Sequence, residues 1–155
     1  MKTILVALAL TISAPVAAET CAVPEGWDKP TPHLAARKAP FKFGLAVGPA
    51  TRLTLLPAGE VTPVVGLGHK AKAGTSAGLA ALDVSRAGKL DIALSTAAYV
   101  DLVSDGKIVA SSGHRHGDAC TGIRKIVTFD VKPGRYVVQL SDAPGTSIVM
   151  QASLN

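Results

Sequence analysis

A series of short segments, in which apolar and polar residues alternate between turn residues, constrains the fold of this chain most. Lys89–Ser95, Arg135–Ser141 and Ser147–Leu154 place their large apolar side chains mainly at every second position. A period of two is that of a β-strand with one buried face. Less regular segments of the same kind complete the set of expected strands: Arg52–Leu56, Thr62–Gly66, Leu79–Ser85, Tyr99–Val103, Lys107–Ser111 and Ile123–Val131.

Turn residues separate these segments at intervals of about ten residues, which is typical of all-β domains. Asp105-Gly106 lies between two apolar runs and predicts a tight hairpin, because both residues tolerate positive φ. The glycine-rich segment Gly66–Gly78 predicts a mobile loop, and no amphipathic helix is evident. We therefore expect an all-β fold, an antiparallel β-sandwich of seven to nine short strands. Its core should be mainly aliphatic, since only 4% of the residues are aromatic.

Residues 1–18 have the features of an export signal. Lys2 precedes the apolar run Ile4–Ile12, and Val16-Ala17-Ala18 offers small residues for cleavage after position 18. The run is too short for a stable bilayer anchor, and the residues before Cys21 differ from those that precede a lipidated cysteine. Cleavage leaves 137 of the 155 residues, which suits one domain. We expect a periplasmic or secreted protein without a membrane span.

The mature chain is predicted to have two parts. Residues 19–40 form a Pro-rich, irregular N-terminal segment, and residues 41–155 form the β-sandwich domain. Four prolines interrupt regular structure in the first part, although His33–Lys38 is long enough for one helical turn. Trp27, the single tryptophan, is expected to anchor this segment against the domain.

Cys21 and Cys120 are the two cysteines of the chain, and both remain after the predicted cleavage. An oxidising compartment favours a disulfide between them. The bond would close a loop of about 100 residues and stabilise the fold by up to about 4–5 kcal/mol in the chain-entropy model. It would also hold the N-terminal segment beside the segment that contains Cys120.

Charge and motif content exclude several classes of function. Without Lys2 the chain has 15 basic and 11 acidic residues, a formal net charge of +4, and the basic residues are scattered. Nucleic-acid-binding proteins typically have a basic stripe or interleaved aromatic residues, so no nucleic acid partner is expected. Gly74–Gly78 matches the G-x-S-x-G pattern of hydrolases, but the strand and helix that must flank this pattern are not predicted.

The densest side-chain chemistry lies in Ser112–Cys120. Within it His114, His116, Asp118 and Cys120 are spaced by two. In an extended segment all four side chains would point to the same side of the backbone. This spacing makes the segment the first candidate for a functional site.

A metal site is one hypothesis for these residues. A His-x-His pair gives a metal two imidazoles, which suit Zn or Cu, and His114 and His116 would need Asp118, His69 or His33 to complete the set. The alternative is a polar, solvated loop bracketed by glycines, in which the cysteine serves only the disulfide.

Three basic residues form a candidate anion site. Arg115, Arg124 and Lys125 would together hold a carboxylate or a phosphate. The alternative is that successive residues of a strand face opposite sides, so that Arg124 and Lys125 diverge.

Part of the chain resembles a known family, the bacterial pre-peptidase C-terminal domain. The segments that carry the resemblance are Leu82-Asp83-Val84, Ala87–Leu94, Val100–Lys107 and Val127–Val138. The resemblance extends over Gly78–Leu154, about half of the chain. It implies a small jelly-roll-like sandwich that carries no catalysis and either assists secretion or binds surfaces and glycans.

A second, narrower resemblance involves the histidines. His114-x-His116 followed by Cys120–Val127 is similar to a group of short exported bacterial proteins, some of which are labelled homogentisate 1,2-dioxygenase. That label implies iron held by two histidines and a glutamate, for which this chain offers Glu19, Glu25 or Glu60.

The sequence as a whole predicts an exported, non-enzymatic binding or accessory module whose partner is a protein, a glycan or a small ligand. The alternative is a small metal-dependent enzyme, an oxygenase, that uses the His-x-His pair and Zn, Cu or Fe.

Overall fold

The computed structural model describes residues 21–155. The predicted export signal, residues 1–18, lies outside the described residues. None of the described residues belongs to a helix long and apolar enough to cross a membrane.

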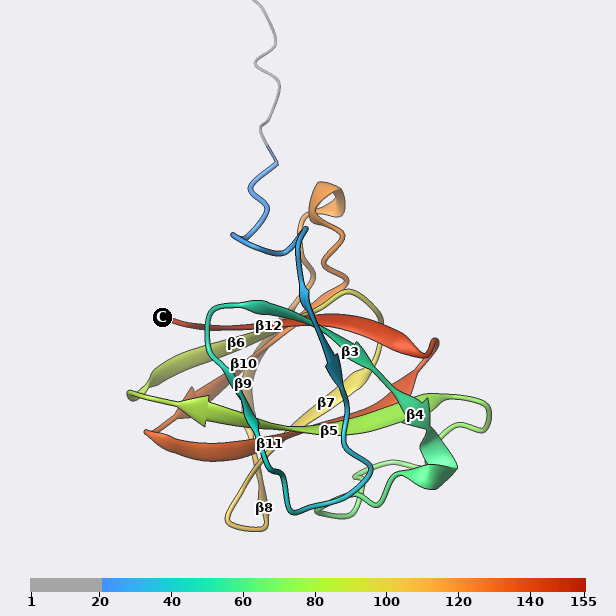
Figure 1. Ribbon diagram of the computed structural model, residues 1–155. Helices are drawn as coiled ribbons and strands as arrows, with labels where there is room; N and C mark the ends of the chain where they lie inside the picture. Colours follow the sequence, from blue (N-terminus) through green and yellow to red (C-terminus); the bar gives the residue numbers. More distant parts are fainter. Residues whose placement is uncertain (1–20) are drawn as a thin grey trace, which may run out of the picture.

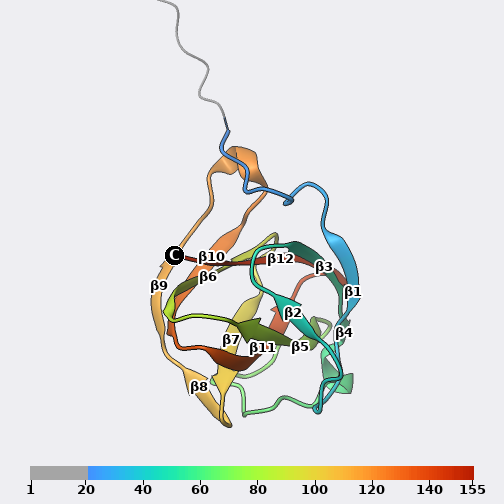
Figure 2. The ribbon, with the colours of Figure 1, turned by 60° about the vertical axis from the view of Figure 1, so that its left-hand side comes forward.

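The described chain is all-β and forms two sheets that lie as two layers (Figures 1 and 2). The first sheet has the order β1 (Thr31–Leu34), β3 (Ala50–Thr54), β12 (Ser147–Leu154), β6 (Gly88–Leu94), β10 (Lys125–Val131) and β9 (Ser111–Arg115). The second sheet has the order β2 (Gly44–Ala46), β5 (Ser76–Val84), β11 (Gly134–Ala143), β7 (Tyr99–Ser104) and β8 (Lys107–Val109), and β4 (Leu56–Pro57) also pairs with β5. Two short 3-10 turns, η1 (Ala58–Glu60) and η2 (Ala119–Thr121), complete the elements.

The strand count and the pairing differ from the sequence prediction. There are twelve strands rather than seven to nine, and both sheets are mixed, because β1 pairs with β3 and β2 pairs with β5 in parallel. The strands that the sequence did not predict are short and lie mainly at sheet edges. Such strands have too few residues to show a period of two, and β1 and β2 pair in parallel with strands that do not follow them directly in the sequence.

Apolar side chains from both sheets form the main core. Leu53, Leu90 and Ile92 from the first sheet and Leu82 and Leu102 from the second are fully buried. On β6 the apolar side chains of the alternating pattern, predicted from sequence, face this core. Each such side chain contributes about 1.5–3 kcal/mol relative to an exposed one, so the core holds the two sheets together.

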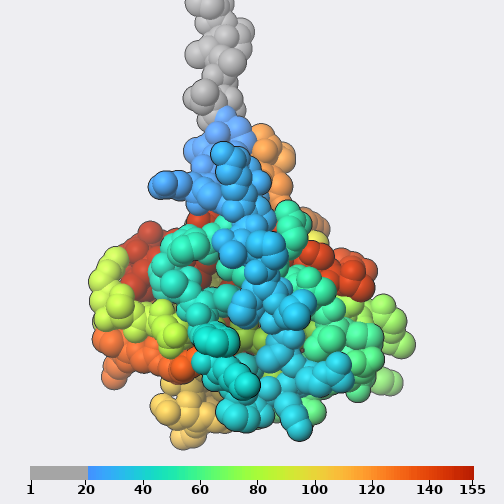
Figure 3. Space-filling view, viewed as in Figure 1, coloured from blue at the N-terminus to red at the C-terminus, as the bar shows by residue number. Residues whose placement is uncertain are grey.

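A smaller apolar cluster lies outside this core and fixes the N-terminal segment. Trp27 packs with Ala50, Ala93, Ile123, Ile126 and Val149. The side-chain amide of Gln151 donates hydrogen bonds to the carbonyl oxygens of Glu25, at 2.9 Å, and Gly48, at 2.7 Å. The anchoring role predicted for Trp27 is therefore confirmed, and Figure 3 shows the N-terminal part of the chain lying along the molecule.

The Pro-rich segment is more ordered than its sequence predicts. β1 lies within residues 19–40 and pairs with β3, and Ala36 forms a bridge with Leu79. Strand pairing thus replaces the helical turn predicted at His33–Lys38. Proline is tolerated here because β1 is an edge strand that needs hydrogen bonds on one side only.

The connections between strands show one confirmed turn and one loop that differs from prediction. Asp105 and Gly106 have φ of 49° and 71° and join β7 to β8 as the predicted hairpin. Thr62–Gly66, expected to be a strand, is a loop held by Gln139, whose side-chain oxygen accepts a hydrogen bond from the Val64 amide at 2.9 Å. Tertiary hydrogen bonding thus takes the place of strand pairing.

The predicted disulfide joins Cys21 to Cys120, with the two Cα atoms 5.9 Å apart. We expect the double variant Cys21→Ser/Cys120→Ser to lose about 2–5 kcal/mol of unfolding free energy, because the unfolded chain gains the freedom of a loop that the bond closes. Urea unfolding followed by Trp27 fluorescence would measure the loss. Reductant should destabilise the wild type and leave the variant unchanged, and equal stability of the two proteins would contradict the prediction.

Candidate functional site

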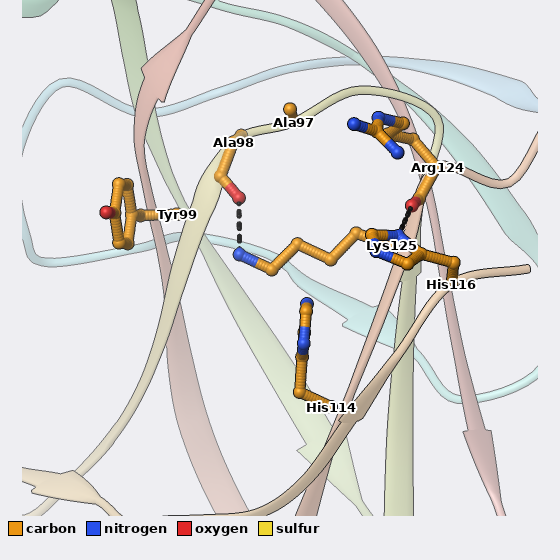
Figure 4. Close-up of a pocket in the computed structure, with 7 residues that line it drawn as sticks. All are labelled: Ala97, Ala98, Tyr99, His114, His116, Arg124 and Lys125. Atoms are coloured by element: carbon orange, nitrogen blue, oxygen red, sulfur yellow. Dashed lines mark hydrogen bonds between the residues drawn. The ribbon is translucent and has the colours of Figure 1, made fainter.

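A hollow with a volume of about 240 Å³ and mainly polar side chains in its wall lies where three segments meet (Figure 4). The connection from β6 to β7 supplies one wall, β9 and the residues after it supply the second, and the start of β10 supplies the third. We call this hollow the basic pocket. Its lining residues are Ala97, Ala98, Tyr99, His114, His116, Arg124 and Lys125.

Arg124 is placed by hydrogen bonds of its own backbone. Its amide donates to the carbonyl oxygen of Leu94 at 2.8 Å, and its carbonyl oxygen accepts from Nδ1 of His116 at 2.8 Å. Strand β10 begins only at the next residue, Lys125. Because Arg124 precedes the regular strand, the alternation of faces does not separate it from Lys125, and both residues line the pocket.

Lys125 is half-buried, and its ammonium group is held by two neighbours from the opposite wall. Nζ donates to the carbonyl oxygen of Ala98 at 3.0 Å and lies 5.1 Å from the centre of the Tyr99 ring, within the range of a cation–π contact. Burial lowers the pKa of Lys125, and the charge of Asp101 partly offsets this effect. Among the described residues no carboxylate forms an ion pair with this ammonium.

The two histidines of the His-x-His pair lie together. The ring centres of His114 and His116 are 5.6 Å apart, with the planes nearly perpendicular. A carbonyl oxygen can only accept, so the Nδ1 of His116 that faces Arg124 carries hydrogen and Nε2 is its other nitrogen. After the histidine pair the backbone passes close to Ile123, and only glycine fits at position 117. A Cβ added there would lie 2.6 Å from the Cβ of Ile123.

The other predicted metal ligands lie elsewhere. Asp118 is exposed at the start of η2, and its carbonyl oxygen accepts from the backbone and hydroxyl of Thr121. His69 belongs to the loop over the second sheet, where its Nε2 lies 3.2 Å from a carboxylate oxygen of Asp142. His33 lies on β1, and Cys120 is in the disulfide. Within residues 21–155 no three His, Cys, Asp or Glu side chains are grouped as a metal site would need.

His69 nevertheless touches the pocket indirectly, through Tyr99. The two rings are stacked with centres 4.1 Å apart and planes at 23°. Tyr99 therefore contacts both the imidazole of His69 and the ammonium of Lys125. The loop over the second sheet and the basic pocket share this one ring.

The glutamates are also distant from the histidine pair. Glu60 forms an ion pair with Arg37 at 3.2 Å, and Glu25 is an exposed residue near Trp27 whose carbonyl oxygen accepts from Gln151. Glu19 lies outside the described residues. Neither described glutamate lines the pocket.

Arg115, the third member of the predicted anion site, does not line the basic pocket. Its guanidinium forms an ion pair with Asp91 at 2.8 Å, and the Asp91 carboxylate also accepts from Thr128 and Asn155. Burial alone would raise the pKa of Asp91, but the hydrogen bonds from Arg115 and Thr128 and the charge of Arg115 outweigh it and lower that pKa. Arg115 therefore has a structural partner.

The sequence did not reveal Tyr99 or the carbonyl of Ala98 as parts of the site. Tyr99 was predicted only as the start of a strand, and no local pattern shows that the β6–β7 connection approaches β10. The neighbouring Ala97-Ala98 pair, a break in the alternating pattern, marks this connection but gives no indication of its role.

Comparison with known proteins adds no assignment: no protein-family model and no curated protein sequence matches the chain. Function is therefore inferred from the pocket itself.

The Asp91–Arg115 pair predicts a defined pH dependence of stability. Because the folded-state pKa of Asp91 is lowered, its contribution is complete above the unfolded value of about 3.9 and is lost as pH falls through the folded value. We expect Asp91→Asn to lose about 1–3 kcal/mol at pH 7 and the difference from wild type to shrink in acid. Urea unfolding at several pH values would measure it.

The matched control for this prediction is Asp118→Asn, which removes an exposed carboxylate that accepts no side-chain hydrogen bond within the described chain. Its stability should follow the wild type at every pH. A constant difference between Asp91→Asn and wild type down to strongly acidic pH would show that the charge of Asp91 is not what stabilises the fold.

Proposed function

We propose that this protein is an exported, non-enzymatic binding module and that the basic pocket is its binding site for an anionic group. A jelly-roll-like sandwich, as implied by the resemblance to the pre-peptidase C-terminal domain, is the proposed scaffold. The observation that carries the proposal is the composition of the pocket wall: two permanent cations and two imidazoles, with no carboxylate among the lining residues.

The charge of the pocket favours an anion for a simple reason. An anion near Arg124 and Lys125 gains attraction from both, and charge-assisted hydrogen bonds to such groups are stronger than neutral ones. Backbone contacts of Arg124 and strand pairing of Lys125 with Leu94 fix the main chain of both residues. The ammonium of Lys125 is also held by the carbonyl oxygen of Ala98, so this donor is positioned before a ligand arrives. Binding of an anion requires no catalytic group in addition to these donors.

The disulfide supports the proposed compartment. Such bonds persist in the periplasm and outside the cell and are rare in reducing compartments, and the bond here joins the N-terminal segment to the segment that follows the histidine pair. Export is therefore consistent with the chemistry of the described residues, although the signal itself lies outside them.

Anion binding would be tested by following backbone amide resonances while phosphate, sulfate and small carboxylates are added. We expect saturable shifts at His116, Arg124 and Lys125. The double variant Arg124→Gln/Lys125→Gln should weaken binding at least tenfold, since it removes both permanent charges.

The control for this test is Arg52→Gln/Lys107→Gln, which removes the same charge from exposed residues that do not line the pocket. It should bind as the wild type does. Failure of every anion to shift these resonances in the folded protein would overturn the proposed function, as would equal weakening by the control variant.

A small metal-dependent enzyme is the second candidate, and one observation favours it. The Nδ1 hydrogen bond of His116 to a backbone carbonyl leaves Nε2 for a metal, which is the usual arrangement of a ligating histidine. The donor set is otherwise incomplete, because no third ligand is grouped with the pair in the described chain and two cations share the hollow. The residues described therefore do not form a complete Zn, Cu or Fe site.

The two candidates differ in the metal that the purified protein carries. We expect protein isolated without chelator to hold no stoichiometric Zn, Cu or Fe. We expect His114→Ala/His116→Ala to lower stability by no more than about 0.5–1.5 kcal/mol, with or without added metal, because the exposed pair contributes one hydrogen bond, from His116 to Arg124. Elemental analysis and thermal unfolding would measure these. A stoichiometric metal that is lost from the variant, with ring cleavage of homogentisate by the loaded wild type, would establish the enzyme instead.

A further inference from the structure

We propose that the group bound in the basic pocket is a doubly charged tetrahedral oxyanion, a phosphate or sulfate, either free or as a monoester. This proposal rests on the anion-binding function proposed above and adds the class of the anion. It follows from how the two permanent cations of the pocket differ from the other basic residues of the described chain.

Lys125 is unusual among these basic residues. It is half-buried, whereas every other lysine and arginine in residues 21–155 is exposed. Four exposed basic side chains also have a carboxylate partner, in the pairs Arg37–Glu60, Lys89–Asp130, Arg115–Asp91 and Arg135–Asp83. The one partly buried ammonium thus has no carboxylate at ion-pair distance. The charge of Asp101 offsets only part of the effect of burial on Lys125. Because a partly buried charge is costly unless it is paired, an anion in the pocket would supply the missing close partner.

The ammonium of Lys125 keeps capacity for a ligand. It has three N–H donors, of which one is used on the carbonyl oxygen of Ala98 at 3.0 Å, and the ring of Tyr99 is a further neighbour. These contacts hold the end of a flexible side chain in place inside the hollow. Both contacts are to neutral groups, and the more distant charge of Asp101 only partly compensates the ammonium for its burial.

The guanidinium of Arg124 has more free hydrogen-bond donors than the ammonium of Lys125. The backbone of Arg124 is fixed on both sides, through Leu94 and His116, while its side chain makes no hydrogen bond or ion pair to another described residue. A guanidinium offers five N–H donors in a fork that matches the oxygens of a carboxylate, a phosphate or a sulfate. The backbone of Arg124 is therefore fixed, while its guanidinium has no hydrogen-bond partner among the described residues.

The arrangement of the donors favours a tetrahedral group over a planar one. In Figure 4 the guanidinium of Arg124 lies to one side of the Lys125 chain and the ring of His114 lies to the other, pointing toward it. A carboxylate has two oxygens in one plane, whereas a phosphate or sulfate presents oxygens in several directions. A charge of −2 also matches the two permanent cations, and it gains twice the Coulomb energy of a single charge at the same place.

The experiment is calorimetric titration of the disulfide-bonded protein at constant pH and ionic strength with four probes. Sulfate and inorganic phosphate represent the free ions, glucose 6-phosphate represents a monoester, and acetate represents the monovalent carboxylate. We expect the doubly charged probes to bind at least tenfold more tightly than acetate. Arg124→Gln and Lys125→Gln should each remove most of this preference, and Arg52→Gln and Lys107→Gln should preserve it.

The outcomes separate the two proposals. Tighter binding of glucose 6-phosphate than of inorganic phosphate would identify an ester as the source of the group, and the reverse order would identify the free ion; both support the proposed class. Acetate binding as tightly as sulfate, with loss in the pocket variants, would overturn the tetrahedral class and keep the anion site. No saturable binding of any probe, or binding that the pocket variants leave unchanged, would overturn both.

Discussion

Burial of the apolar faces of two sheets against each other is the constraint on which the rest of the molecule depends. Each strand of the core must present aliphatic side chains inward, as β6 does with Leu90 and Ile92. The chain must also cross from one layer to the other, because β6 belongs to the first sheet and β7 to the second. That crossing brings Ala98 and Tyr99 to the start of β10, so the pocket arises at a place where the core requires a change of layer.

Hydrogen bonds to backbone carbonyl oxygens, rather than side-chain ion pairs, organise this pocket. The carbonyl oxygen of Leu94, at the end of a core strand, fixes the amide of Arg124, whose own carbonyl oxygen fixes the ring of His116. Three segments are joined by two bonds of 2.8 Å. The charged ends of Arg124 and Lys125 therefore remain available for a ligand. Arg115, which lies between the two histidines in the sequence, instead pairs with Asp91 and is used by the fold.

Much of the fold could be predicted because its long strands carry a period of two, which is visible in Ser147–Leu154 at Ile148, Met150, Ala152 and Leu154. The short edge strands could not, since β1 and β2 are defined by parallel partners far away in sequence. The same limit applies to the site. The histidine pair was evident from its spacing. Arg124 and Lys125 line the pocket together because β10 begins only at Lys125, and Tyr99 contributes because the β6–β7 connection passes close to the start of β10. A sequence pattern shows neither of these facts.

The position of Trp27 has an optical consequence. Trp27 is the single tryptophan of the chain, it is buried against the outer face of the first sheet, and its indole nitrogen lies 3.9 Å from where a Cβ of Gly122 would be. Gly122 is two residues before Arg124 in the segment that closes the pocket. Indole emission depends on local polarity and packing, so the intrinsic fluorescence of the native protein is a local signal from this corner of the molecule. The residue that secures the N-terminal segment is also a built-in probe beside the pocket.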